Sequence, residues 1–224
     1  MHVPSTGPST HASQQRPPMR RTQAQRVAES DRRMLDAALR LIATRGYSQT
    51  TLEAIGLEAG YSRALVQHRF GSKDKVLEAL IGEIAQAHRA RLLPRLKGLT
   101  GLAALEVEID CYLEGMDDPP MHSRAFFVLM SESIGPAQHV RHAFADIGAR
   151  WQRALAAQIT KGQKSGRIRR DADPKMEAQL LIAAVRGLRL QSMLAPGDDS
   201  IADAIAALKR DLRRRLGLRT TGTA

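Results

Sequence analysis

Residues 50–73 decide the fold of this chain and read TTLEAIGLEAGYSRALVQHRFGSK. The stretch predicts two short helices held at an angle by a glycine turn. Thr50 and Glu53 have the spacing of a capping box, which satisfies free backbone amides at a helix start. The apolar residues of this first helix recur at helical spacing and are Leu52, Ile55 and Ala59. Gly60 then supplies the turn, because glycine adopts the positive φ that other residues resist.

The second helix has an outward face suited to reading DNA. Ser62 can cap its start, and Val66 and Phe70 form its inner face. The outward residues are Arg63, Ala64, Leu65, Gln67, His68 and Arg69. Arginine can bind guanine or phosphate, glutamine can pair with adenine, and leucine can touch the methyl group of thymine. The spacing predicts a helix-turn-helix, whose second helix enters the major groove of DNA. An ordinary amphipathic helix with a solvated face is the alternative.

The longer stretch over residues 32–84 resembles the TetR family of transcriptional regulators. The matching positions are Gly46 and Tyr47, Thr50 and Thr51, then Ala59, Gly60 and Ser62, and finally His68, Phe70, Ser72 and Lys73. Three positions depart from the family pattern: Gly56 replaces alanine, Leu57 replaces a polar residue, and Gln67 replaces the usual tyrosine. Gly56 costs about 1 kcal/mol of helix propensity but permits another helix to approach closely.

The resemblance implies an all-α fold with two parts. An N-terminal three-helix helix-turn-helix domain is joined by a linking helix to a C-terminal α-helical domain that binds an effector and dimerises. The linking helix is expected over residues 72–93, before Pro94. Lys73 and Lys75 lie in its first turn, where helix amides and a cation can both meet phosphate. The residues expected to contact DNA are Thr50, Thr51, Arg63, Ala64, Leu65, Gln67, His68, Arg69 and Lys73.

The composition changes along the chain and predicts four segments. These are a disordered N-terminal extension at 1–25, the helix-turn-helix domain at 26–75, the effector-binding and dimerisation domain at 76–217, and a disordered tail at 218–224. The extension has too few apolar residues to offset the entropy of ordering. Its residues Arg16, Arg20 and Arg21 suggest an arm in the minor groove, and a solvated tail is the alternative. The first helix is expected to start between residues 26 and 31 and to stop at Gly46.

The overall charge agrees with DNA binding without proving it. The 224 residues carry a formal net charge of +11, which favours polyanions and gives salt-dependent attraction to DNA. This charge is not confined to the helix-turn-helix half, so it would suit other acidic partners too. Hydrophobic residues make up 43% of the chain, and the apolar runs are too short to span a bilayer. The single cysteine, Cys111, excludes an intrachain disulfide, and no signal-peptide core is present, so we expect a cytoplasmic protein that does not bind membrane.

The chain after Pro94 predicts helices only. They are expected over residues 99–116, around 126–130, and over 136–162, 173–195 and 200–216. The helix over 173–195 is apolar on two sides, with Leu188 on one and Val185 on the other. One side can serve the subunit's own core and the other a partner chain. The resemblance implies a homodimer through a four-helix bundle, built from the helices over 136–162 and 173–195 of each subunit. Two reading helices would then meet a palindromic operator.

The C-terminal part carries no catalytic signature. It contains no GxSxG elbow, HExxH helix, P-loop or dinucleotide-binding fingerprint, so we expect neither an enzyme nor a cofactor. His139 and His142 have a spacing compatible with metal binding. Two solvated histidines are the more economical interpretation, and no metal is expected.

A small-molecule effector is implied by the resemblance, bound among the helices of the C-terminal domain. The candidate lining residues are Tyr112, Met116, Phe126, Met130, Phe144 and Trp151. Each of them can instead fill the core. Aromatic residues are only 4% of the chain, which argues against an aromatic cage for a quaternary cation.

These observations predict a sequence-specific DNA-binding transcriptional regulator, a repressor that a small-molecule effector releases from its operator. One alternative is an effector-independent or nucleoid-associated DNA-binding protein with the same helix-turn-helix. The other is a basic protein that binds membrane or protein partners through its C-terminal arginines. Specific DNA binding separates the first two from the third, and ligand-dependent release separates the first from the second.

Overall fold

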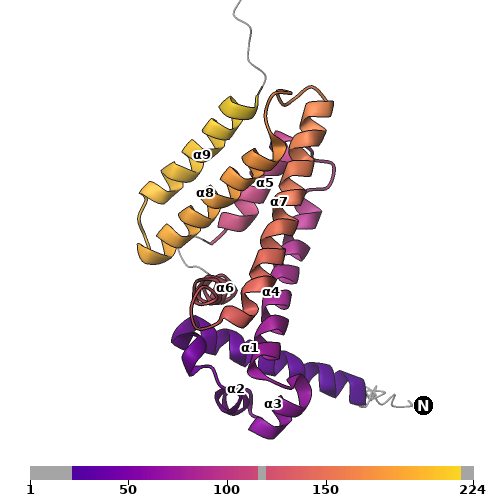
Figure 1. The fold of residues 1–224 in the computed structure, drawn as a ribbon, viewed down its shortest axis with the longest axis vertical. Helices are drawn as coiled ribbons and strands as arrows, with labels where there is room; N and C mark the ends of the chain where they lie inside the picture. The colour runs from indigo at the N-terminus through magenta and orange to yellow at the C-terminus, as the bar shows by residue number, and fades with distance from the viewer. Residues whose placement is uncertain (1–21, 116–119, 218–224) are drawn as a thin grey trace, which may run out of the picture.

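The computed structural model describes residues 22–115 and 120–217, and over these residues the chain forms helices and no strand (Figure 1). The helices are α1 (Gln23–Gln49), α2 (Leu52–Ala59), α3 (Arg63–Phe70), α4 (Lys73–Arg95), α5 (Leu102–Leu113), α6 (Met121–Glu132), the short 3-10 helix η1 (Gln138–Val140), α7 (Arg141–Lys164), α8 (Pro174–Leu194) and α9 (Ser200–Leu216). Helices α1 to α3 gather at one end, and α8 and α9 lie at the other (Figure 1). The all-α fold with an N-terminal helix-turn-helix is confirmed. No helix within the described ranges is long and apolar enough to cross a membrane.

Helix α1 begins earlier than the sequence predicted. Thr22 caps it: its hydroxyl accepts a hydrogen bond from the Gln25 N–H, and the Gln25 side chain accepts one from the Thr22 N–H. This capping box places residues 22–25 with the helix and not with the N-terminal extension. Gly46, with a φ of 76° and a ψ of −179°, is non-helical and interrupts α1 where the sequence predicted a stop, and a short helical segment follows it to Gln49. The rest of the expected extension, its three arginines and the expected C-terminal tail lie outside the described residues.

Helix α2 starts one residue later than predicted. Thr51 is the N-cap, and its hydroxyl accepts a hydrogen bond from the Ala54 N–H at 3.0 Å. The expected capping box between Thr50 and Glu53 is therefore wrong. Thr50 is instead buried, and its hydroxyl donates to the Gly46 carbonyl oxygen at 2.8 Å, which closes the end of α1.

The turn between α2 and α3 follows the sequence prediction. Gly60 ends α2 with a φ of 77°, in the left-handed region that favours glycine. The Ser62 hydroxyl accepts a hydrogen bond from the Leu65 N–H at 3.2 Å, so it caps α3 as expected. Gly56 lets the two helices approach, since a Cβ there would lie 2.8 Å from the Tyr61 carbonyl oxygen. The close approach predicted for Gly56 is confirmed.

The remaining helices differ from the prediction mainly at their ends. Helix α4 contains Pro94 in its last turn and continues one residue beyond it. Helix α5 is shorter than expected, and η1 stands before α7 where a single helix was predicted. Asp173 caps α8 as predicted, because its carboxylate accepts a hydrogen bond from the Lys175 N–H at 2.9 Å, with Pro174 in the first turn.

Two hydrophobic cores organise the described part of the molecule. The first joins α1 to α4 with α6, η1 and the start of α7, and it includes Leu129 and Phe144. The second lies among α5, α7, α8 and α9. Helix α6 packs against α1 although the two are far apart in sequence. The end of the molecule formed by α1 to α3, which carries the helix-turn-helix and is called the DNA-binding end below, is therefore held to the rest of the protein by α4, α6 and α7.

Candidate functional site

The exposed face of α3 forms the candidate DNA-binding surface. The exposed side chains on this helix are Arg63, Ala64, Gln67 and His68. Thr51 is also exposed, at the start of the neighbouring α2. The structure thus brings these predicted contacts to one end of the molecule. They include groups that can read base edges and groups that can bind phosphate.

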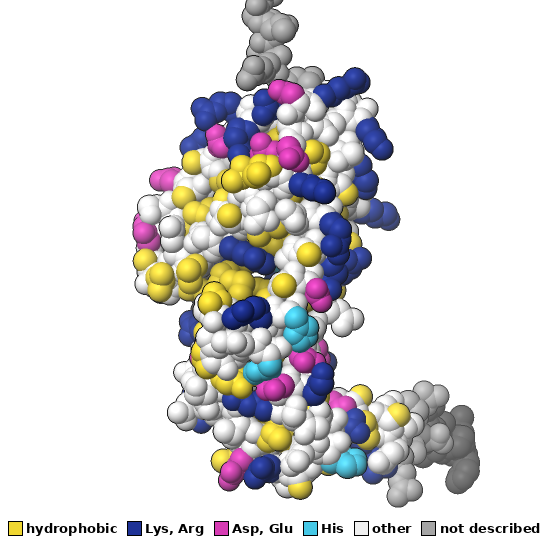
Figure 2. Space-filling view, in the orientation of Figure 1, with side chains coloured by type: hydrophobic (Ala, Val, Ile, Leu, Met, Phe, Trp, Pro, Cys, Tyr) yellow, Lys and Arg dark blue, Asp and Glu magenta, His cyan; other side chains and the backbone are white. Residues whose placement is uncertain are grey.

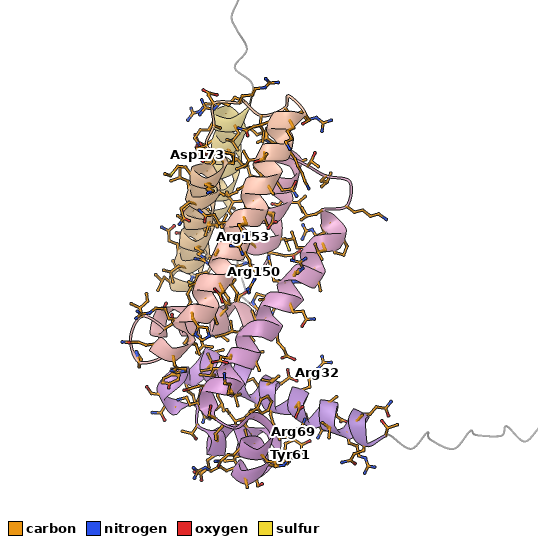
Figure 3. All side chains as sticks on the ribbon, turned by 45° about the vertical axis from the view of Figure 1, so that its right-hand side comes forward. Arg32, Tyr61, Arg69, Arg150, Arg153 and Asp173 are labelled. Carbon is orange, nitrogen blue, oxygen red and sulfur yellow. The ribbon has the colours of Figure 1, made fainter. Side chains whose placement is uncertain are left out.

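Three other predicted DNA contacts are engaged by other groups of the protein itself. Leu65 is half-buried and packs against the first core, and Thr50 is buried. The Arg69 guanidinium donates to both carboxylate oxygens of Asp31 on α1, at 2.7 and 2.5 Å. Leu65 and Arg69 are thus less exposed than expected, because the first core and Asp31 take up part of that side of α3, and their contacts with DNA stay predictions. Figure 3 labels Arg69 close to Tyr61, at the DNA-binding end.

Lys73 has a role within the protein that the sequence did not reveal. Its ammonium donates to the Tyr47 carbonyl oxygen at 2.6 Å and lies 3.4 Å from the centroid of the Tyr47 ring. Burial lowers the pKa of Lys73 below its ordinary value. These contacts tie the first turn of α4 to the end of α1. The phosphate contact expected of Lys73 stays a prediction.

Five residues form a junction cluster between the DNA-binding end and the C-terminal helices: Tyr47, Lys73, Asp74, Glu132 and His139. The Glu132 carboxylate, at the end of α6, accepts a hydrogen bond from the Tyr47 N–H at 2.8 Å. The His139 ring lies 5.4 Å from the Tyr47 ring, and its Nε2 lies 2.9 Å from the Asp74 carboxylate. A displacement of α4 or α6 therefore acts directly on the end of α1.

A cavity of about 400 Å³ lies between α4, α5, α6, α7 and α8. Its apolar lining includes Ile84, Leu92, Phe126, Phe127 and Ile147. Its charged and imidazole lining consists of His88, Arg89, Arg91, Glu108, His122, Arg150, Arg186 and Arg189. A concave site of this size that combines apolar walls with polar groups is suited to small-molecule binding.

Only some of the residues that were predicted to line an effector site lie at the cavity. Tyr112, Phe126 and Trp151 line the cavity. Phe144 is buried in the first core and Met130 packs against that core, so neither lines this cavity. The reason is that the end of α6 and the start of α7 pack against the DNA-binding helices. Met116 lies outside the described residues.

The aromatic wall of the cavity is tightly organised. The rings of Tyr112 and Trp151 stack with centroids 4.7 Å apart. The Trp151 indole N–H donates to the buried Glu108 carboxylate at 3.1 Å. Burial raises the pKa of Glu108 above its ordinary value and raises the pKa of Tyr112 to about 12. The Tyr112 hydroxyl is therefore protonated at neutral pH.

The two histidines of the cavity are neutral at pH 7. Burial, together with the nearby Arg91 guanidinium, lowers the pKa of His88 to about 4. Burial also lowers the pKa of His122. The ring of His88 meets the edge of Tyr112, with centroids 5.9 Å apart. Both imidazoles thus offer hydrogen bonds without adding charge.

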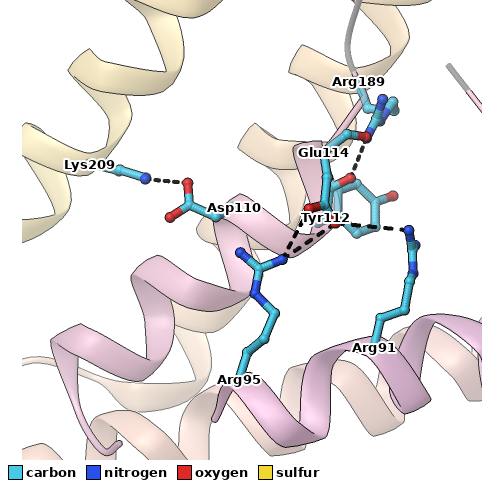
Figure 4. Close-up of polar contacts among 7 residues, drawn as sticks. All are labelled: Arg91, Arg95, Asp110, Tyr112, Glu114, Arg189 and Lys209. Atoms are coloured by element: carbon cyan, nitrogen blue, oxygen red, sulfur yellow. Dashed lines mark hydrogen bonds and ion pairs between the residues drawn. The ribbon is translucent and has the colours of Figure 1, made fainter. Parts of the chain in front are cut away.

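Arg189 holds the end of α5 in place (Figure 4). Its guanidinium donates to the carbonyl oxygens of Tyr112 at 2.6 Å, Glu114 at 2.7 Å and Gly115 at 3.2 Å. The carbonyls lie at and just beyond the C-terminal end of α5, where helix carbonyls lack helical partners, so the arginine satisfies them and complements the helix dipole. The Glu114 carboxylate pairs with Arg91 at 3.9 Å (Figure 4).

The polar lining was missed because its residues come from five different helices, α4 to α8. One signal was available in the sequence: Arg186 and Arg189 interrupt an otherwise apolar stretch of α8. A charged residue that is turned toward a protein interior needs a partner, so such interruptions mark candidate polar sites.

Comparison with known proteins agrees with this two-part architecture. Residues 34–80 match the description "Bacterial regulatory proteins, tetR family", and residues 103–217 match "BetI-type transcriptional repressor, C-terminal". An HTH-type transcriptional regulator BetI from Cronobacter sakazakii is 28% identical over 135 residues, 55% of this chain and 66% of that protein. One from Brucella anthropi is 44% identical over 59 residues, 25% of this chain and 30% of that protein. The matches span less than two thirds of either relative's length.

Solved structures share the fold. A transcriptional regulator from Saccharomonospora viridis in complex with choline has a TM-score of 0.73 and 25% identity, covering 86% of this chain and 100% of that one. A TetR transcriptional regulator from Chloroflexus aurantiacus J-10-FL has a TM-score of 0.78 at 19% identity, covering 86% of this chain and 98% of that one. The second likeness concerns the fold alone.

Proposed function

The chain belongs to the TetR family of bacterial regulatory proteins, with a BetI-type C-terminal domain, and we propose that it is a dimeric repressor released from a palindromic operator by a small-molecule effector. The family is one of regulators and not of enzymes. The observation that carries the proposal is the physical connection between the two sites. Helices α4 and α6 both line the cavity and both contribute to the junction cluster. The protein would act on DNA in the cytoplasm.

DNA reading is assigned to the exposed face of α3. We propose that Arg63 and Gln67 contact base edges, while His68 and Thr51 contact the backbone, because these side chains are exposed at the DNA-binding end. In a dimer, two such helices would read half-sites about one helical turn apart. Selection of bound sequences from a random DNA pool tests this directly, and a palindromic consensus is the expected result.

Arg63→Ala is expected to relax sequence preference and to reduce operator affinity by roughly 5–150-fold per half-site, the effect of about 1–3 kcal/mol from one bidentate base contact. Lys73→Ala is expected to weaken all sequences about equally, because phosphate contacts position the protein without specifying sequence. Fluorescence anisotropy with the selected operator and a scrambled duplex measures both effects.

A suitable control is Arg153→Ala, which removes an exposed arginine on α7, away from the DNA-binding end (Figure 3). It should leave sequence preference unchanged. An Arg63→Ala variant that selects the same consensus with the same affinity would mean that α3 is placed incorrectly on DNA.

Dimerisation is assigned to an apolar stripe along α8. Its residues are Met176, Leu180, Ala183, Gly187, Leu190 and Leu194, which alternate spacings of four and three. The four large side chains are 57%, 46%, 43% and 76% exposed in the single chain, in that order. Figure 2 shows hydrophobic side chains gathered over the region of α8 and α9. Such spacing is typical of helices that pack against partner helices. We therefore propose a four-helix bundle of α7 and α8 from each subunit.

Effector binding is assigned to the cavity beside Trp151. The Saccharomonospora viridis regulator holds choline, which supports a small-molecule site in a domain of this fold. A ligand that changes the spacing of α4 and α6 would shift Lys73 and Glu132, and with them the end of α1. The two DNA-binding ends of a dimer would then no longer match adjacent major grooves.

Operator DNA is expected to weaken effector binding by the same factor by which effector weakens operator binding, because linkage is reciprocal. A coupling of about 1–3 kcal/mol corresponds to a shift of roughly 5–150-fold. Trp151 is the only tryptophan of the chain and lines the cavity, so its fluorescence follows effector titrations. We expect saturating operator to move the titration midpoint upward. An effector that releases DNA while its own affinity is the same with and without operator must act by competing at the DNA-binding surface.

A further inference from the structure

We propose that the effector is an organic anion with an apolar body, and not a quaternary ammonium cation such as choline. This inference rests on the proposed function, since it concerns the ligand of the same cavity. It is carried by the charge of the cavity lining and by three buried polar atoms that lack an acceptor among the described residues.

The lining is strongly positive. Five arginines contribute to it, Arg89, Arg91, Arg150, Arg186 and Arg189, whereas Glu108 is the single carboxylate among its described residues. Electrostatic interactions are strengthened in a cleft with low-dielectric walls, so the potential there favours negative ligands. A cationic ligand would be repelled by this positive potential.

Not all of these arginines are already engaged. The Arg189 guanidinium donates hydrogen bonds to carbonyl oxygens at the end of α5, and Arg91 pairs with Glu114. Arg89 and Arg150 make no hydrogen bond or ion pair with any residue in the described part of the chain. Two guanidinium groups at the cavity therefore remain free to receive a carboxylate or another oxyanion.

Three buried polar atoms of the lining lack an acceptor among the described residues: the Tyr112 hydroxyl, whose oxygen interacts with the Arg186 side chain, Nε2 of His122 and Nε of Arg186. Each of them can donate. The Tyr112 hydroxyl is protonated, the Arg186 Nε carries a hydrogen, and a neutral His122 can carry its hydrogen on Nε2. Buried donors require acceptors. An oxyanion supplies them, and a trimethylammonium group cannot.

The aromatic wall is also arranged unfavourably for a cation. Tyr112 and Trp151 stack with their ring centroids 4.7 Å apart, which leaves no slot between them for a trimethylammonium group. The Arg186 guanidinium carbon already lies 5.8 Å from the Trp151 ring centroid, in the position of a cation–π partner. A second cation over the same ring would be repelled by it.

The rest of the lining favours an apolar body beside the anionic group. Ile84, Leu92, Phe126, Phe127 and Ile147 line the cavity of about 400 Å³. Burial of an alkyl or aryl group against them would add affinity in proportion to the apolar area removed from water. The expected ligand is thus amphipathic, with one oxyanion and a moderate hydrocarbon portion.

Matched eight-carbon probes test this charge preference. Octanoate, 1-octanol and octyltrimethylammonium share one chain and differ in the head group, and choline supplies the small cation. We expect calorimetry and Trp151 fluorescence on the full-length protein to give octanoate an affinity at least ~10-fold above 1-octanol, the effect of about one charge-assisted hydrogen bond. Neither cation should exceed 1-octanol.

Variants locate the preference in the cavity. Arg186→Gln should reduce octanoate affinity ~10-fold and leave 1-octanol affinity unchanged, because the glutamine removes the charge and keeps most of the side chain. Arg150→Gln, at an exposed position, should act in the same direction without affecting the fold. Arg153→Gln is the matched control, since it removes an exposed arginine of the same helix that does not line the cavity (Figure 3).

Three results would overturn the inference. The first is binding of octyltrimethylammonium or choline at least as tight as that of octanoate, with loss of that binding in Glu108→Gln. The second is absence of octanoate binding. The third is an octanoate preference that survives Arg186→Gln combined with Arg150→Gln. Release of labelled operator is measured separately. A cation that binds and releases operator contradicts the anion inference alone, whereas octanoate that binds without releasing operator contradicts its role as effector.

Discussion

Leu180→Glu combined with Leu190→Glu is expected to convert the protein from a dimer to a monomer and to reduce operator affinity by at least ~100-fold, because the two DNA-binding ends would no longer be linked. Both leucines belong to the apolar stripe of α8 and are 46% and 43% exposed in the single chain. Burial of four unpaired carboxylates in a dimer interface is strongly unfavourable. Sedimentation velocity at micromolar concentration measures the oligomeric state, and anisotropy measures operator affinity.

The matched control is Leu93→Glu, which places a carboxylate at a leucine of α4 that is 49% exposed and lies outside the stripe. It should stay dimeric. Circular dichroism should report unchanged helicity in both variants, since every substituted side chain is exposed. A double variant that sediments as a dimer would show that α8 is not the interface, and a monomeric parent protein would rule out the dimer altogether.

Gly46→Ala is expected to lower the free energy of unfolding by roughly 2–4 kcal/mol, because it combines backbone strain with the loss of a partly buried hydrogen bond. Gly46 has φ of 76° and ψ of −179°, a region that is open essentially only to glycine. A Cβ there would also lie 2.9 Å from a carboxylate oxygen of Glu132. Glu132 would have to move away from the Tyr47 N–H that it now binds. Urea unfolding at 25 °C measures the change.

Gly60→Ala provides the comparison, since Gly60 has a similar φ of 77° but no atom within 4 Å of the place that an alanine methyl group would take. Its expected cost is only the left-handed strain of roughly 1–2 kcal/mol. Equal destabilisation by the two substitutions would indicate that the Glu132 contact contributes nothing, and that the junction cluster does not hold the two ends of the protein together.

The local structure of the DNA-binding end was predictable because it depends on neighbours in sequence. Gly60 and Ser62 specify the turn and the start of α3 through their own backbone and hydroxyl. The recurrence of apolar residues predicted helices throughout, whatever their partners. The error at the start of α2 shows the limit of prediction from neighbouring residues alone. Thr50 and Thr51 can both cap a helix, and only the burial of Thr50 at the end of α1 decides between them.

The sequence did not predict correctly which side chains of α3 are exposed and which are engaged by other helices. Arg63 and Arg69 are the same residue type on one short helix, yet Arg63 is exposed and Arg69 is bound by Asp31. Asp31 lies on another helix, far away in sequence. The periodicity of α3 alone does not reveal which helix passes beside it, so the free and the engaged arginine could not be told apart.

The sequence by itself therefore determined the helices, the helix-turn-helix and the family resemblance, since these depend on residue order over short distances. Tertiary structure alone decided the character of the cavity. Periodicity marks a side chain as buried but does not distinguish a packed core, as for Phe144, from a cavity wall, as for Phe126. The arginines around the cavity come from α4, α7 and α8, so their charges add up only after folding has brought these helices together.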